Sequence, residues 1–399
     1  MTAAPLSRTE KLHAQRQEQI KTFAANAGSF VEHSIGSFIE HREEAPVLSA
    51  SPVNHVWYRI PIPEGLSGDG TAYHIYLKKG HTQRLCIFLS GGGVAWNEYP
   101  AARPVTGAAV AAGEPNYYWN NLRPFTQIMN INIGITETSP VRNPFFDWNM
   151  IVVPYTTGDF HVGQSEFPYT ALDVSRQILH FHGKQNFEAA MRRALSFFPS
   201  PSKLLLAGDS AGAFAVPALA GEVADRWYPG CRDITLFSDS ALLLSSKWQS
   251  IARDVWQAAP PVWEALRSDN LFLDWYRALL SAHPERFRCL FASSTHDYLL
   301  SAFYNDMTNK VYRTDAAVRS AYHRQLRRQI TSLRSLNPHF AFFINNWQNP
   351  LYTKAQLGTI HTAVRLRYFY TRTKKGVTMA DWLRDAVEGK TYDVGTELL

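Results

Sequence analysis

Residues 204–212 read Leu-Leu-Leu-Ala-Gly-Asp-Ser-Ala-Gly, and this stretch decides which fold the rest of the chain has to fit. An apolar run leads into a Gly-x-Ser-x-Gly pattern, and a helix-like stretch that begins with small residues follows it. A serine on a very sharp turn between a strand and a helix projects its hydroxyl from the sheet edge, where flanking side chains would clash. The pattern predicts a nucleophile at Ser210. A chance match in a Gly/Ser turn is the alternative, which the flanking strand and helix disfavour.

Apolar runs that read as strands recur on both sides of this motif, with helix-like stretches between several of them. The expected strands cover residues 72–77, 85–89, 150–154, 203–207, 234–237, 288–292 and 339–344, and the expected helices include residues 172–198 and 211–226. Buried runs that alternate with helices indicate a mostly parallel sheet covered on both faces. We therefore predict an α/β fold of α/β-hydrolase type, in which a mostly parallel central sheet is flanked by helices, with an insertion near the site at residues 96–149.

The 399 residues are enough for one large domain or two ordinary ones. Residues 8–41 carry an irregular apolar stripe after Thr9, a possible helix cap, and a Pro-rich connection follows at residues 45–64. We predict an N-terminal helical arm over residues 1–50, packed on a single domain over residues 51–399. The sequence shows no internal repeat and no low-complexity segment.

The composition is that of a soluble globular protein with a large core, at 45% hydrophobic and 19% charged residues. Aromatic residues reach 13%, which suits a deep core, or alternatively a pocket for an apolar or sugar-like ligand. The net charge is +6, and positive charge concentrates at residues 319–334 and 365–375. The first of these stretches has helical spacing, which favours a solvated helix face over a nucleic-acid site. We predict no nucleic-acid partner.

The cysteines and the N-terminal residues favour a reducing compartment. The three cysteines, Cys86, Cys231 and Cys289, form no CxxC pair and no disulfide framework, and Cys86 lies in a strand-like run that predicts a buried thiol. Residues 1–30 contain basic residues but no long apolar stretch, and no window of ~18 apolar residues exists anywhere. We therefore expect no transmembrane segment and a cytoplasmic location by default, with export independent of a signal peptide as the alternative.

A second glycine-rich stretch follows an early strand at residues 85–93, Leu-Cys-Ile-Phe-Leu-Ser-Gly-Gly-Gly. In ester hydrolysis a carbonyl oxygen gains negative charge and needs backbone N–H donors, and glycines let the backbone approach closely. Hydrolases of this fold take one donor set from such a loop and another from the residue after the nucleophile. Gly92, Gly93 and Ala211 are the predicted donors. A flexible turn or a phosphate loop is the alternative, but the Gly-Lys-Ser/Thr ending of a phosphate loop is missing.

Residues 143–163, Asn-Pro-Phe-Phe-Asp-Trp-Asn-Met-Ile-Val-Val-Pro-Tyr-Thr-Thr-Gly-Asp-Phe-His-Val-Gly, resemble the pectin acetylesterase family, which includes plant and bacterial pectin acetylesterases and the animal Notum carboxylesterases. That family shows a Gly-Gly loop, a Val-Pro-Tyr-Cys-x-Gly-Asp-like segment and a Ser-Ala-Gly turn, and all three occur here in that order. The resemblance spans residues 55–390, and its Thr-Gly-Asp-x-His form is most similar to the bacterial branch. It implies an esterase of the α/β-hydrolase fold.

Three departures from the family pattern are visible. Thr156 replaces the cysteine of the Pro-Tyr-Cys segment, which removes a disulfide there. Gly93 and Val94 stand where a tryptophan often follows the paired glycines, although Trp96 is close, and the secretory signal of many relatives is missing. The last two departures weaken the case for pectin as substrate more than the case for the reaction type.

A serine nucleophile needs a histidine to take its proton and a carboxylate to orient that histidine, and in this fold they follow the serine in the order acid, then histidine. The histidines after the serine are His283, His296, His323, His339 and His361. The family places its histidine late, after the last strand and before a helix, which favours His361. The resemblance also matches Asp297 to the catalytic aspartate. Asp239, which likewise ends a strand, is the alternative, and the family has a structural aspartate there.

Asp159 and His161 lie two residues apart and invite interpretation as a dyad or a metal pair. Two ligands in an extended segment make no metal site without partners elsewhere, and both residues precede the nucleophile. We therefore interpret Asp159 as a loop anchor and His161 as a candidate pocket residue, together with Trp96 and Phe214. We predict no metal and no organic cofactor.

These residues together predict a serine carboxylester hydrolase that removes an acyl or acetyl group through an acyl-enzyme. Ser210 attacks the ester carbonyl, His361 acts as general base, and Asp297 stabilises the imidazolium. The expected substrate is an ester of a small molecule or a polysaccharide. A deacylase, lipase or polyester hydrolase, an acyltransferase, and a non-catalytic binding protein on a hydrolase scaffold are the alternatives.

Overall fold

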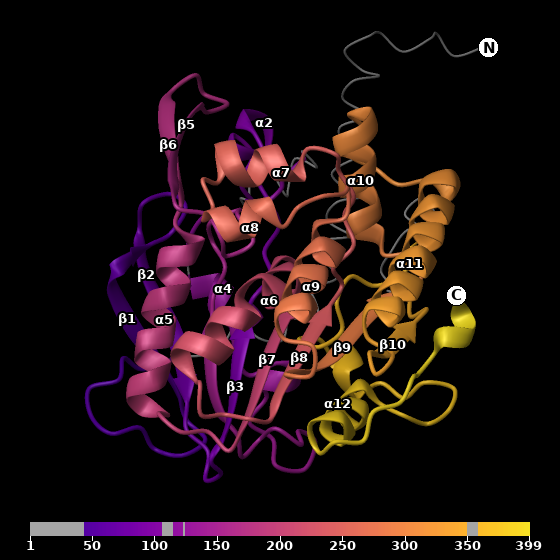
Figure 1. The fold of residues 1–399 in the computed structure, drawn as a ribbon. Coiled ribbons are helices and arrows are strands. Elements are labelled where there is room, and N and C mark those ends of the chain that lie inside the picture. Colours follow the sequence, from indigo (N-terminus) through magenta and orange to yellow (C-terminus); the bar gives the residue numbers. More distant parts are fainter. Residues whose placement is uncertain (1–43, 106–114, 123, 349–357) are drawn as a thin grey trace, which may run out of the picture.

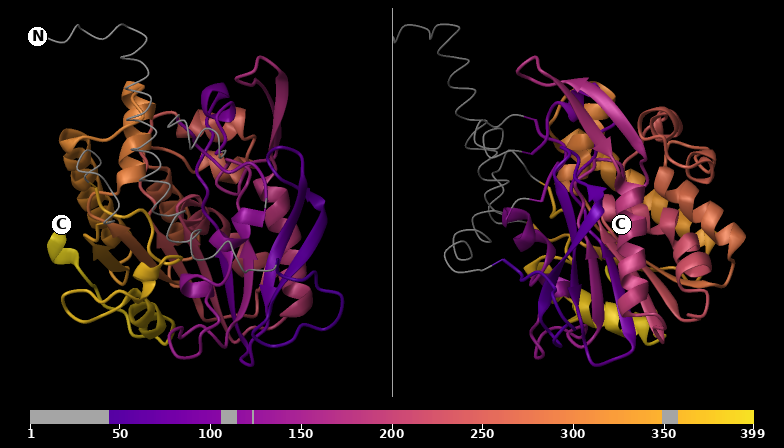
Figure 2. Two further views of the ribbon diagram at one scale, coloured as in Figure 1. Left: turned by 180° about the vertical axis from the view of Figure 1, so that it is seen from behind. Right: turned by 90° about the vertical axis from the view of Figure 1, so that its left-hand side faces the viewer.

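A computed structural model describes residues 44–105, 115–122, 124–348 and 358–399, and its centre is a twisted eight-stranded sheet (Figure 1). The strands of the sheet are β1 (Trp57–Leu66), β2 (Ala72–Lys78), β3 (Arg84–Leu89), β4 (Asn149–Val153), β7 (Lys203–Asp209), β8 (Ile234–Asp239), β9 (Phe287–Ser294) and β10 (Ala341–Asn345). A separate two-stranded hairpin consists of β5 (Ser165–Thr170) and β6 (Arg176–Phe181). Figure 2 shows this hairpin projecting beyond the sheet.

The strand order is β1-β2-β4-β3-β7-β8-β9-β10. Strands β4, β3, β7, β8, β9 and β10 run parallel to one another, and β2 is antiparallel to both β1 and β4. Without the hairpin the order reads 1-2-4-3-5-6-7-8 with an antiparallel second strand, which is the topology of the α/β-hydrolase fold. Parallel strands bring their carboxyl ends to one edge, where ligands bind in open α/β sheets.

Both faces of the sheet are covered, as the continuous apolar runs predicted. Along β3, Leu85, Ile87 and Leu89 enter one core cluster, and the alternate residues Cys86 and Phe88 enter another. The first cluster is completed by helices α5, α6, α9, α10 and α11, and the second by α12 and the aromatic residues before β4. The helices are α2 (Glu98–Ala101), α4 (Pro124–Asn130), α5 (Gly183–Phe197), α6 (Ala211–Glu222), α7 (Trp248–Ser250), α8 (Pro260–Glu264), α9 (Leu271–Ala282), α10 (Tyr298–Asn309), α11 (Ala316–Leu336) and α12 (Met379–Val387).

The predicted strands are confirmed with shifts of one or two residues at their ends, but two other predictions are wrong. Residues 172–198 do not form one helix, because β6 occupies Arg176–Phe181 and α5 begins at Gly183. In β6, Leu179 and Phe181 are buried at a spacing of two, the period of a strand, which the helical interpretation overlooked. The Pro-rich connection at residues 45–64 also contains the start of β1.

Two further sequence predictions agree with the described residues. Residues 319–334 lie in α11, and Arg324, Arg327 and Arg328 are exposed on it. The three cysteines are buried and free. Among the residues that the structure describes, no helix has the length and apolar character needed to span a membrane. The predicted helix at residues 8–41 lies outside the described residues, and the division into residues 1–50 and 51–399 stays a prediction.

The close packing of α6 on β3 yields a prediction for Gly212. A Cβ at this position would lie 1.9 Å from the carbonyl oxygen of Leu89, so a side chain there would force the helix away from the strand. We expect Gly212→Ala to lower the free energy of unfolding by about 1–3 kcal/mol or more, measured by urea denaturation. Gly230→Ala is the control, since a Cβ there meets no heavy atom within 4 Å. Equal unfolding midpoints for the two variants would contradict this account.

Candidate active site

Ser210 stands on the turn between β7 and α6 that the sequence predicted. Its backbone has φ 50° and ψ −122°, outside the regions that L-residues favour, as a nucleophile turn requires. The turn is held from both sides, because Ser210 N donates to Asp239 O at 2.8 Å and Ser210 O accepts from Ala213 N at 2.9 Å. Ser210 is only partly buried, so its hydroxyl lies at the edge of the sheet, where a substrate can approach.

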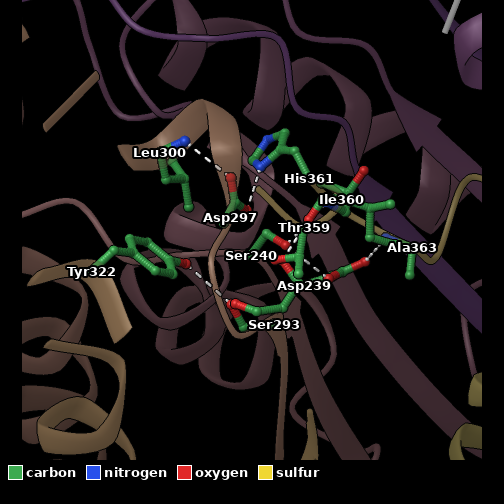
Figure 3. A network of polar contacts seen from close by, with 12 residues as sticks. Asp239, Ser240, Ser293, Asp297, Leu300, Tyr322, Thr359, Ile360, His361 and Ala363 are labelled. Carbon is green, nitrogen blue, oxygen red and sulfur yellow. Dashed lines mark hydrogen bonds and ion pairs between the residues drawn. The ribbon is translucent and has the colours of Figure 1, made fainter. Parts of the chain in front are cut away.

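Asp297 and His361 are brought together from segments 64 residues apart. Asp297 follows β9 and caps α10, where its Oδ1 accepts from Leu300 N at 3.0 Å. Its Oδ2 lies 2.8 Å from Nδ1 of His361, and Figure 3 shows the carboxyl group between these two nitrogens. Since the carboxylate accepts, Nδ1 carries the hydrogen and Nε2 is left with its lone pair. This is the tautomer that a general base at Nε2 needs.

The charge around His361 sets its protonation. Burial alone would lower the pKa of His361, but the carboxylate of Asp297 outweighs it, with further contributions from Asp209 and Asp239, and the pKa is raised above its usual value. Asp297 itself is fully buried, whereas the side chain of His361 retains 14% exposure. The imidazolium that would form during proton transfer is therefore stabilised by a desolvated anion.

The hydrogen bond that a general base would make with the Ser210 hydroxyl is not formed in this structure. Among the described residues, Nε2 of His361 is buried and has no hydrogen-bond partner. Asp239 connects the two segments: its carbonyl oxygen accepts from Ser210 N, and its carboxylate accepts from the backbone N–H of Ala363 at 2.6 Å. Catalytic hydrogen bonds are often long or misaligned in unliganded enzymes and tighten with substrate.

The loop that carries His361 is fixed on the end of β9. Oγ of Ser294 donates to the carbonyl oxygen of Ile360 at 2.5 Å, and Thr359 Oγ1 donates to Ser294 Oγ at 2.7 Å. The backbone N–H of His296 in turn donates to Thr359 Oγ1 at 2.8 Å. The loop position is therefore set by hydrogen bonds immediately before the imidazole.

Asp239, the alternative acid, has a different set of partners. Its carboxylate accepts from the backbone N–H groups of Ala363 and Val364 at 2.6 and 2.8 Å and from the hydroxyl of Ser240 (Figure 3). Burial raises the pKa of Asp239 to about 6, although these N–H donors oppose the rise. The contacts are those of a residue that anchors the loop beyond the histidine, and they favour Asp297 as the partner of His361.

The glycine-rich loop lies against the nucleophile turn. A Cβ on Gly91 would come within 2.6 Å of Ser210 Cβ, so only glycine fits, and the N–H of Gly91 is taken by Asp209 Oδ1 at 2.8 Å. Within the described chain, no acceptor is bonded to the N–H groups of Gly92, Gly93 or Ala211, the three predicted oxyanion donors. Their role as oxyanion donors stays a prediction, whereas Gly91 has a structural role.

Sequence reasoning missed the residues that hold this arrangement. Asp209 directly precedes Ser210 in the Gly-x-Ser-x-Gly pattern and is buried. Its Oδ2 lies 2.7 Å from both Nε and Nη2 of Arg365. Arg365 is also buried, and its Nη1 donates to the carbonyl oxygen of Met129 at 2.6 Å. The only sequence signal was an aspartate beside the nucleophile, and the basic stretch 365–375 gave no hint that its first member is buried.

Asp159 is a loop anchor, as predicted. Its buried carboxylate accepts from Thr157 Oγ1 at 2.6 Å, from His161 N at 3.1 Å and from Gly183 N at 2.8 Å. His161 is buried, with Nε2 3.0 Å from the carbonyl oxygen of Ser90. Burial lowers the pKa of His161 to about 4, so the ring is neutral at pH 7 and donates this bond. It supports the residue that precedes the glycine loop.

Two aromatic residues that the sequence suggested for a substrate pocket, Trp96 and Phe214, lie in the core. Trp96 packs edge-on against Tyr117, and Phe214 stacks on Phe160, so both are buried among aromatic rings. A role of Trp96, His161 and Phe214 in a substrate pocket stays a prediction.

The other histidines that follow the serine in the chain have different surroundings from His361. His283 pairs with Asp225, His339 is exposed, and His296 stacks on His323. Among the residues that the structure describes, two clusters of histidine and carboxylate side chains have metal-ligand spacing, and neither includes Ser210, Asp297 or His361.

A comparison with protein-family models identifies a family whose fold matches this architecture. A search of curated protein sequences gave no match. The family model described as pectinacetylesterase matches residues 64–305, more than half of the chain, and these include Ser210 and Asp297 but not His361. Members of this family are carboxylic ester hydrolases of the α/β-hydrolase fold. The chain therefore belongs to the pectinacetylesterase family.

Proposed function

We propose that this esterase uses Ser210 as nucleophile, His361 as general base and Asp297 as the carboxylate that orients the base. His361 Nε2 takes the proton of the Ser210 hydroxyl as its oxygen attacks the ester carbonyl. The tetrahedral oxyanion is held by the backbone N–H groups of Gly92, Gly93 and Ala211. Collapse releases the alcohol, which receives the proton from His361, and water then hydrolyses the acyl-enzyme with His361 again as base.

One observation carries the proposal: the Asp297–His361 contact at 2.8 Å, in which the far nitrogen of the imidazole is left without a hydrogen bond. Most buried polar side-chain atoms in proteins have a hydrogen-bond partner, so a buried imidazole nitrogen without one indicates a functional group. The strained backbone of Ser210 supports the same assignment, since sparsely populated φ/ψ values cluster at active sites.

For the substrate, we propose an acetyl ester of a carbohydrate. The support comes from the family description, which names acetylated pectin as the material on which members act. One fold serves many substrates, so the acyl group and the alcohol need their own test. A lipid, a lipidated protein or a polyester would use the same three residues.

Replacing the nucleophile tests the mechanism directly. We expect Ser210→Ala to reduce hydrolysis of p-nitrophenyl acetate by about 10³-fold or more, since background activity would come only from binding and the oxyanion donors. The variant should also lose labelling by a fluorophosphonate, detected by intact mass. Ser196→Ala, at an exposed serine on α5, is the control and should behave as the unmodified protein. Substantial hydrolysis by Ser210→Ala would end the assignment.

The pH dependence tests which carboxylate serves His361. The base must be neutral, so kcat/KM should fall as the pH drops through the raised pKa of His361. In Asp297→Asn the charged imidazole loses its partner, so we expect this midpoint to move to lower pH and kcat to drop by about 10⁴-fold. Asp239→Asn should keep most of the rate with a smaller downward shift, because Asp239 contributes less to the raised pKa. The reverse ranking would make Asp239 the catalytic acid.

An ester panel separates the possible acyl substrates. We expect kcat/KM to be highest for acetyl esters and acetylated saccharides and to fall as the acyl chain lengthens from acetyl to octanoyl. The measurement is initial rate by pH-stat, with Ser210→Ala as blank. A preference for long acyl chains would point to a lipid substrate, and transfer to an added alcohol in place of water would identify an acyltransferase.

A further inference from the structure

The hairpin β5–β6 carries a group of side chains that the proposed mechanism does not use. Glu166 on β5 pairs across the hairpin with His180 on β6, and His182 follows two residues later. Residues directly opposite each other, and residues two apart, share one face of a β-ribbon. The pairing register therefore brings Glu166 and His180 together on one face. His182 lies just beyond the end of β6 and completes the group, and the ligand atoms of the three residues all lie within 4.8 Å of one another.

We propose that Glu166, His180 and His182 form a binding site for a divalent transition metal of the Zn²⁺ type. Nitrogen and carboxylate oxygen are the ligands that Zn²⁺ takes in proteins, at about 2.0–2.2 Å. Three ligands from the chain leave further coordination positions for water. Glu166 is half exposed, at 50%, so an ion can enter from solvent without unfolding of the hairpin.

The contacts within the group have the character of ligands that converge on one point. Glu166 Oε1 lies 2.7 Å from His182 Nε2, and Oε2 lies 2.6 Å from His180 Nδ1, so each oxygen faces a separate nitrogen. The contact between Nδ1 of His180 and Oε2 has the distance of an ion pair but not the angles of a hydrogen bond. Tetrahedral bonds of the length quoted above put ligand atoms about 3.3 Å apart, a separation that a small movement of the exposed Glu166 supplies.

The two histidines are held in place by other parts of the chain. His180 N donates to Gly68 O at 2.9 Å, and a Cβ on Gly70 would lie 3.0 Å from the far nitrogen of the His180 ring. His182 stands at the N-terminus of α5 without capping it, since Asp159 takes the Gly183 N–H. The ring of His180 is thus positioned before an ion binds, and the ring of His182 packs edge-on against it, which lowers the cost of ordering the two rings.

A second group of the same residue types gives a comparison within the chain. His55, His81 and Asp147 also lie within ligand spacing, but both rings approach one oxygen, Asp147 Oδ1, at 2.8 and 2.9 Å. That oxygen also accepts from the backbone N–H of His81 at 2.8 Å, and His55 stacks on Phe146. Three donors already share this one oxygen, whereas the two oxygens of Glu166 each face one nitrogen, so we do not infer a metal at the second group.

The test is Zn²⁺ titration of chelator-treated full-length protein by isothermal titration calorimetry, with Co²⁺ absorption as a second readout. We expect one Zn²⁺ per chain, a d–d spectrum of low-coordinate Co²⁺, and a melting temperature that rises with Zn²⁺. His182→Ala and Glu166→Gln should each weaken binding by about tenfold or more, and His81→Ala should bind as the unmodified protein does.

The outcomes separate a metal site from a hydrogen-bonded surface group. Absence of stoichiometric binding in the unmodified protein would overturn the proposal, and so would binding that survives both His182→Ala and Glu166→Gln. Loss of binding in His81→Ala alone would assign the ion to the other group. Glu166→Gln alters a half-exposed side chain, so it keeps the test valid if His182→Ala fails to fold. Ester hydrolysis by Ser210 is measured separately and does not decide the result.

Discussion

The buried carboxylate of Asp209 is the constraint on which the candidate site depends. One of its oxygens accepts the N–H of Gly91, and the other pairs with the guanidinium of Arg365. Three segments that are far apart in the chain, the glycine loop, the nucleophile turn and the segment after His361, are thereby joined at one anion. A buried charge persists only when it is paired, and removal of one partner of such a pair typically costs about 3–5 kcal/mol. The pair therefore fixes the geometry of the site more than it stabilises the fold.

Three carboxylates stand at the carboxyl ends of three adjacent strands, and their partners give them three different roles. Asp209 ends β7 and binds a guanidinium, Asp239 ends β8 and binds backbone N–H groups, and Asp297 follows β9 and binds an imidazole. All three raise the pKa of His361, and Asp297 contributes most. A base that is more easily protonated accepts the serine proton more readily, so the whole sheet edge favours proton transfer.

The sequence was sufficient for features that depend on local pattern. The apolar runs located the strands of the parallel sheet, and the Gly-x-Ser-x-Gly turn placed Ser210 on a strained backbone. Features that depend on pairing between distant segments could not be predicted from the sequence. The second strand of the hairpin, β6, was included in a predicted helix over residues 172–198, because the tight turn at Asp173–Ser175 contains no glycine or proline. The Asp209–Arg365 pair joins residues 156 positions apart, and no local signal marks such a contact.

The assignment of His361 shows where resemblance and geometry complement each other. The family match ends at residue 305, so it does not cover the segment that carries the base. That segment is held largely through its backbone, because Ser294 binds the carbonyl oxygen of Ile360 and Asp239 binds the N–H groups of Ala363 and Val364. Backbone contacts place few demands on side-chain identity, so the sequence there can vary while the loop keeps its position. The histidine is therefore identified better by its contact with Asp297 than by any pattern in its neighbours.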